Sequence, residues 1–194
     1  LEIIMSSIER EKAIELFKKY NTEPSLFKHA LSVEAAMRYF ASKYNEDSEE
    51  WAMVGFLHDL DYEKYPDEHC IKVKEILEKE GLPDYFIRAI QSHGFGDFID
   101  IEPITNMEKT LYAVDELSGF ITACALVRPS KSLDDMEVKS VKKKLKDKAF
   151  AAKIDRNIIK SGAERLGISL DELIQETINA LKPIQEEIGL QKIS

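Results

Sequence analysis

The sequence predicts an all-α fold, with the helices arranged as a single domain over residues 1–194. Apolar residues recur at the 3.6-residue period of a helix along almost the whole chain. Prolines and capping pairs stand where helices would begin, and glycines stand where several would end. No run alternates apolar and polar residues over enough positions to predict a strand. These three observations define the expected fold class.

The first half of the chain divides into five expected helices. Their beginnings are marked by the capping pair Ser6 and Glu9, by Pro24, by the capping pair Asp47 and Glu50, by Pro66 with Asp67, and by Pro83. The first is expected to run to about Tyr20, the fourth to Gly81, and the fifth to the pair His93-Gly94. His29 lies on the apolar face of the second helix.

The second half is expected to hold four more helical segments. Their marks are Pro103 with the capping box Thr105 to Glu108, a basic amphipathic run over about 135–152, the ending Leu166-Gly167, and the capping box Ser169 to Glu172. Asp115 lies in the first of these segments, and Pro183 is expected to kink or end the last. Residues 95–103 are expected to form a loop that borders a site.

The composition describes a folded, acidic protein. Apolar residues make up 44% and charged residues 32% of the chain, which is typical of a globular domain. The formal net charge of −9 argues against a nucleic-acid duplex or an anionic membrane as partner, since both require positive surfaces. The apolar runs are too short for a membrane span, no signal peptide is recognisable and the two cysteines form no disulfide framework, so we expect a cytoplasmic protein. The oligomeric state is not indicated.

The histidines, together with two aspartates, form the most informative pattern. In chain order the residues are His29, His58, Asp59, His69, His93 and Asp115. Taken singly, a histidine on an apolar helical face is usually a packed, hydrogen-bonded core residue. Together and unpaired, these groups would cost roughly several kcal/mol of desolvation, which a bound cation removes. Gly55, one turn before His58, would let a neighbouring helix approach closely. We therefore predict a buried centre with two metals.

The same residues carry a family resemblance. The stretch GFLHDLDYEKYPDEH, with QSHG and AVDELSGF downstream, resembles the binuclear branch of the HD-domain superfamily of metal-dependent phosphohydrolases. The resemblance implies a helical bundle with a metal-binding core over about 24–120 and additional C-terminal helices over about 134–190. It also implies two metal sites: one held by His29, His58, Asp59 and Asp115, and one held by His69 and His93, with Asp59 as the bridge. The chain departs from the common HD-I-G-K version, because Asp61 and Tyr62 stand where that version has glycine and lysine.

For function, the resemblance implies hydrolysis of a small phosphate ester, a nucleotide or a related phosphomonoester or diester. Divalent cations (Mn, Mg, Fe, Ni, Co or Zn), bridged by Asp59, would supply a metal-bound hydroxide as the nucleophile. Asp61 and Glu63 are candidates for the general acid or for orienting a ligand histidine, and solvated loop positions are the alternative for both.

Basic residues are the candidates for holding the phosphate. Lys64, Lys142 and Lys146 are the ones we single out. The alternative for the lysine-rich run from 139 to 148 is an exposed helical face.

Two other functions are compatible with the same residues. A di-iron oxygenase would use the same number of ligands, with tightly bound iron and consumption of O₂. A non-catalytic sensor or binding domain would use the metals structurally, with a closed coordination sphere.

Overall fold

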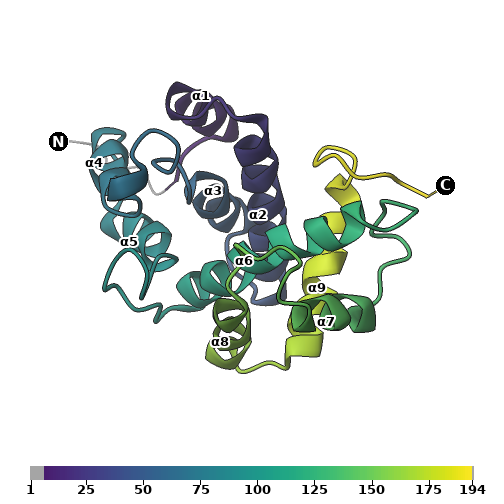
Figure 1. Ribbon diagram of the computed structural model, residues 1–194. Coiled ribbons are helices and arrows are strands. Elements are labelled where there is room, and N and C mark those ends of the chain that lie inside the picture. The colour runs from purple at the N-terminus through teal and green to yellow at the C-terminus, as the bar shows by residue number, and fades with distance from the viewer. Residues whose placement is uncertain (1–6, 194) are drawn as a thin grey trace.

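The computed structural model describes residues 7–193, and every regular element in that range is a helix, which confirms the all-α prediction. The elements are α1 (Arg10–Tyr20), α2 (Pro24–Lys43), α3 (Ser48–Leu57), the 3₁₀ turn η1 (Pro66–Glu68), α4 (Lys72–Lys79), α5 (Asp84–Ser92), α6 (Asn106–Leu126), α7 (Val138–Lys146), α8 (Arg156–Leu166), α9 (Leu170–Leu181) and η2 (Lys182–Ile184) (Figure 1). Within the described range, no helix combines the length and the apolar character that crossing a bilayer requires.

Several predicted helix ends are confirmed by their hydrogen bonds or backbone angles. The Asp47 carboxylate accepts two backbone N–H groups in the first turn of α3. The hydroxyls of Thr105 and Ser169 accept the amide three residues later, at the starts of α6 and α9. Gly81 and Gly167 follow α4 and α8 with φ of +77° and +69°, a conformation that glycine adopts without strain.

Two predicted boundaries are wrong. The first helix begins at Arg10, with Glu9 at its N-cap and no side-chain capping bond, and Ser6 lies outside the described residues. The basic segment is helical only over α7, and residues 148–153 form turns. The Arg156 guanidinium holds these turns in place by donating to carbonyl oxygens of the segment, among them those of Asp147 and Ala151. Each of these two oxygens also accepts the backbone amide three residues later, as in a turn.

The predicted fourth helix is also wrong, because it is two elements. The short turn η1 is separated from α4 by Cys70, whose φ of +67° lies in the left-handed region. A right-handed helix cannot continue through such a residue. The break matters for the site, since His69 lies directly before it.

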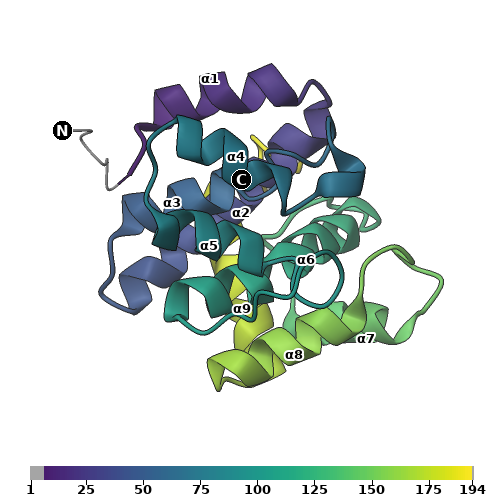
Figure 2. The ribbon, with the colours of Figure 1, turned by 90° about the vertical axis from the view of Figure 1, so that its left-hand side faces the viewer.

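Helices α2 and α6 form the centre of the molecule. Helix α2 packs against α3, α6 and α9, and α6 packs against α5, α7, α8 and α9 as well. Helices α7 and α8 lie on the side opposite α1 in both views (Figures 1 and 2). The core contains five phenylalanines that are almost completely buried: Phe17, Phe40, Phe56, Phe86 and Phe120. This packing fixes the helix ends that carry the predicted ligands.

Candidate metal centre

The structure brings all six predicted ligands to one place. His29 lies within α2 and Asp115 within α6, whereas His58, His69 and His93 each lie directly after the end of a helix or 3₁₀ turn. Gly55 allows α3 to approach α2 closely enough to bring His58 beside His29. A Cβ atom at residue 55 would lie 2.7 Å from the Val33 carbonyl oxygen, so only glycine permits the observed approach.

Four of the ligands form one half of the centre. The Nε2 atom of His29 lies 3.2 Å from His58 Nε2 and 2.9 Å from Asp115 Oδ1. The Nε2 atom of His58 lies 3.2 Å from Asp115 Oδ1 and 3.2 Å from Asp59 Oδ2. These four residues offer two nitrogens and two oxygens around a single point.

The other half uses the second oxygen of the same aspartate. Asp59 Oδ1 lies 3.4 Å from His69 Nε2 and 3.3 Å from His93 Nε2, and these two nitrogens are 3.2 Å apart. Each carboxylate oxygen of Asp59 therefore faces a different pair of histidines. Asp59 thus lies between the two sets of nitrogen donors.

Hydrogen bonds on the outer side fix three of the imidazole rings. The Nδ1 atom of His58 donates to the Gly55 carbonyl oxygen at 2.6 Å, and His93 Nδ1 donates to the carbonyl of Ile90. His69 Nδ1 bonds the Asp61 carboxylate at 2.7 Å. Since carbonyl and carboxylate oxygens only accept, the hydrogen of each neutral ring is on Nδ1. The Nε2 lone pairs therefore point inward, which is how metal-ligating histidines are held.

The donor set fits divalent cations. Nitrogen and oxygen ligands that share a tetrahedral ion lie roughly 3.3 Å apart, given metal–ligand bonds of about 2.0–2.1 Å. The distances from histidine Nε2 to its neighbouring donors run from 2.9 to 3.6 Å in the first half and from 3.2 to 3.4 Å in the second. Inward lone pairs at such distances repel one another unless a positive charge lies between them.

The pKa values show the same demand for positive charge. Burial opposes the charged form of His58, but the carboxylates of Asp59 and Asp115 outweigh it and raise the pKa to about 10. Burial also opposes the charged form of His69, but the hydrogen bond that its Nδ1 donates to Asp61 outweighs burial and raises the pKa to about 9. In turn, His58 lowers the pKa of the Asp59 and Asp115 carboxyls despite their burial. Without metal, protons take the place of the cations.

Metal binding is therefore expected to release protons. With pKa values of about 10 and about 9, His58 and His69 are protonated at pH 7.5 in the metal-free protein, whereas a cation binds only the deprotonated nitrogen. The affinity for metal should rise as the pH increases towards 9 and fall as the pH decreases. Calorimetric titration in two buffers of different ionisation enthalpy measures the released protons. Equal heats in both buffers would contradict this expectation.

The centre opens into a cavity of about 450 Å³, which is a size suited to a small molecule. The side chains of His58, His69 and His93 are almost fully buried, whereas His29 is 23% and Asp115 16% exposed. Asp59 is 17% exposed as well, so a ligand reaches the centre at His29, Asp59 and Asp115. The 95–103 loop borders the cavity as predicted, through Asp97 and Phe98.

The structure separates the two candidate acids that follow the pair His58-Asp59. Asp61 is fully buried, and its oxygens bond His69 Nδ1 and the backbone N–H of Val73. This favours the orienting role over the role of general acid, because neither oxygen faces the cavity. Glu63 is not brought to the centre: its carboxylate accepts the backbone N–H and the hydroxyl of Thr22.

The three lysines predicted to hold phosphate do not line the metal cavity. Lys64 lies over the rings of Tyr20 and Tyr65, at 5.3 and 5.9 Å from their centroids. Lys142 and Lys146 line a neighbouring cavity, where Lys142 is paired with Asp171.

Sequence reasoning missed three residues at the centre. Cys70 is buried, and its sulfur lies 3.7 Å from His93 Nε2. Burial alone would raise the pKa of this thiol, but His93 outweighs burial and lowers it to about 7. Glu116 and Lys153 line the cavity. Burial and the neighbouring Asp115 raise the pKa of Glu116 to about 7. Cys70 and Glu116 could have been found from the sequence, because each directly follows a predicted ligand. No sequence pattern pointed to Lys153.

Comparison with protein families matches residues 26–119 to the HD domain. Comparisons with curated proteins and with solved structures gave no match. The matched range contains all six converging residues, from His29 to Asp115. HD domains bind divalent metals, and most are metal-dependent phosphohydrolases. Through residues 26–119, this chain belongs to the HD-domain superfamily.

Proposed function

We propose that this protein is a phosphohydrolase that uses two divalent cations to hydrolyse a small phosphate ester, a nucleotide or a related phosphomonoester or diester. The observation that carries the proposal is the position of Asp59. One of its oxygens faces His58 at 3.2 Å, and the other faces His93 at 3.3 Å. A single carboxylate placed between two sets of nitrogen donors supports a binuclear site.

The side chains that line the cavity are mainly acidic, so an anionic substrate is favoured only when cations are bound. Asp97, Glu116 and Asp155 line it, and Lys153 is the only lysine or arginine among its lining residues in the described part of the chain. When bound, two divalent cations lower the pKa of water and offset the charge of a phosphoryl group. Their charge of about +4 exceeds the charge of about −2 on Asp59 and Asp115, so the floor of the cavity becomes positive.

Residues of the chain support the nucleotide as substrate. Tyr62 and Phe98 both line the cavity and are 45% and 48% exposed. Both rings pack edge-on against His69, with centroid distances of 5.1 and 4.8 Å. Exposed aromatic rings beside a phosphate site offer a surface on which a nucleobase can stack.

The test is a metal-defined assay of phosphate release. The protein is stripped with chelator and reloaded separately with manganese, cobalt, zinc or iron, and the metals per chain are counted. A panel of nucleotides, monoesters and diesters is then offered in ¹⁸O-labelled water. We expect hydrolysis without O₂, with the label in the released phosphate. Two metals per chain with no ester hydrolysed, and O₂ consumed by the iron form, would overturn the proposal in favour of an oxygenase.

A further inference from the structure

A second cavity, of about 870 Å³, lies between α7, residues 147–155 and α8. We infer that it binds a second anionic group of the substrate, so that the substrate is a phosphate ester with another phosphate or carboxylate remote from the reacting one. This inference rests on the proposed function and specifies the class of substrate.

The cavity is basic in a protein that is acidic overall. Its lining includes six basic side chains, namely Lys142, Lys146, Lys148, Lys153, Arg156 and Lys160, and one acidic side chain, Asp155. Lys142 is neutralised by Asp171 at 2.7 Å. Among residues 7–193, the structure shows no acidic partner for the other four lysines. A chain with a net charge of −9 has many carboxylates, yet it leaves these ammonium groups without one.

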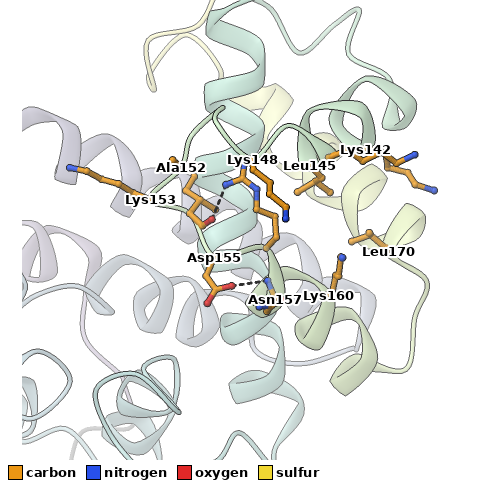
Figure 3. Close-up of a pocket in the computed structure, with 12 residues that line it drawn as sticks. Lys142, Leu145, Lys148, Ala152, Lys153, Asp155, Asn157, Lys160 and Leu170 are labelled. Carbon is orange, nitrogen blue, oxygen red and sulfur yellow. Dashed lines mark hydrogen bonds between the residues drawn. The ribbon is translucent and has the colours of Figure 1, made fainter.

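Two of these lysines point into the same space. The amino groups of Lys148 and Lys160 both extend into the cavity between the 147–155 segment and α8 (Figure 3). The Asp155 carboxylate is bonded to the backbone of Asn157, at the start of α8. Like charges directed into one space repel each other, and an anion between them relieves that repulsion through charge-assisted hydrogen bonds.

The wall of the cavity is held in place before any ligand binds. The guanidinium of Arg156 donates to the carbonyl oxygens of Ala151, Ile154, Asp147 and Phe150. Arg156 also lies over the Phe120 ring, at 5.0 Å from its centroid. Because the segment that carries Lys148 and Lys153 is fixed in this way, a ligand does not have to order it on binding.

The two cavities share a wall. Lys153, Ile154 and Asp155 line both the basic cavity and the metal cavity. The inference requires that a molecule with its phosphate at the metal centre pass this segment to reach Lys148 and Lys160. Two separate positive sites suit a ligand with two anionic groups. The cations would bind the reacting phosphate, and the lysines would bind the remote group.

The first test compares adenosine 5′-monophosphate with adenosine 3′,5′-bisphosphate on the metal-loaded protein. Each lysine is acetylated briefly with and without ligand, and its extent of labelling is measured by mass spectrometry. We expect the bisphosphate to protect Lys148 and Lys160, and the monophosphate to leave them labelled. Lys139 and Lys143, which lie on α7 but do not line this cavity, serve as internal controls. Equal labelling of Lys148 and Lys160 with either ligand would overturn the inference.

The second test measures the ratio of kcat/KM for the bisphosphate to that for the monophosphate. The double variant Lys148→Gln, Lys160→Gln should lower this ratio about tenfold, the loss expected for a hydrogen bond to a charged group. The variant Lys139→Gln, Lys143→Gln makes the same change in net charge and should keep the ratio. An equal fall in both variants would contradict a specific site.

The two proposals can fail separately. Protection of Lys148 and Lys160 without hydrolysis of any ester would remove the proposed function and support the cavity as an anion site. Hydrolysis of monoesters with no protection and no preference for the bisphosphate would remove the cavity's role and leave the function standing.

Discussion

Replacing Asp59 by asparagine is expected to remove both metals from the protein. The two oxygens of Asp59 face different histidine pairs, at 3.2 Å from His58 and at 3.4 and 3.3 Å from His69 and His93. Asparagine keeps the shape of the side chain but offers one oxygen, no charge and an NH₂ group that repels a cation. Loss of an outer hydrogen-bond partner of a ligand costs about 10–100-fold in affinity or activity. Loss of Asp59 as the bridging ligand should lower the metal affinity at least about 100-fold.

The measurement is the number of metals per chain after gel filtration, together with phosphate release. Asp97→Asn is the matched control, because Asp97 lines the same cavity and lies outside the ligand set. It should keep both metals. His69→Ala provides a further comparison, since it removes a donor from one half alone and should lose one metal. A full metal complement in Asp59→Asn would show that Asp59 does not bridge.

The convergence of the six residues could be predicted from sequence because burying an imidazole is costly. His29 and His58 stand on apolar helical faces, and an unpaired polar group there must find a partner. The same reasoning identified Gly55, whose missing side chain brings α2 against α3. Helix boundaries were predictable where a capping residue or a left-handed glycine sets them locally.

The roles of the residues after the pair His58-Asp59 could not be separated in this way. Asp61 and Glu63 are two residues apart in a segment of turns, and no helical or strand period fixes which side chain points inward. Contacts with distant parts of the chain decide instead: Asp61 is held by Val73, and Glu63 by Thr22.

The lysines that line each cavity could not be predicted from sequence either, for a different reason. Lys142 and Lys146 lie on one face of α7, as the spacing predicts, but that face lines the basic cavity and not the metal cavity. Lys153 reaches the metal cavity from a segment of turns that Arg156 holds through hydrogen bonds. A tertiary contact of this kind has no periodic signature.

Replacing Gly55 by alanine is expected to destabilise the protein although alanine is the better helix former. The added Cβ would lie 2.7 Å from the Val33 carbonyl oxygen and 2.8 Å from Met37 Cγ. The first of these is backbone of α2, so relief requires the two helices to move apart. Overpacking costs about 1–3 kcal/mol, and helix propensity returns at most about 1 kcal/mol. Because the closest contact is with backbone, the cost should prevail, lowering the free energy of unfolding by about 1–2 kcal/mol.

Gly119→Ala is the matched control, since it is also a glycine within a helix. A Cβ there would meet only the Cδ1 atom of Ile154, at 3.8 Å, an ordinary contact. This variant should therefore gain up to about 1 kcal/mol, and denaturant unfolding of the two metal-free variants measures the difference in sign. Moving α2 away from α3 also separates His29 from His58, so Gly55→Ala should bind metal more weakly. A stabilised Gly55→Ala protein with unchanged metal affinity would mean that the close helix contact does not set the geometry of the centre.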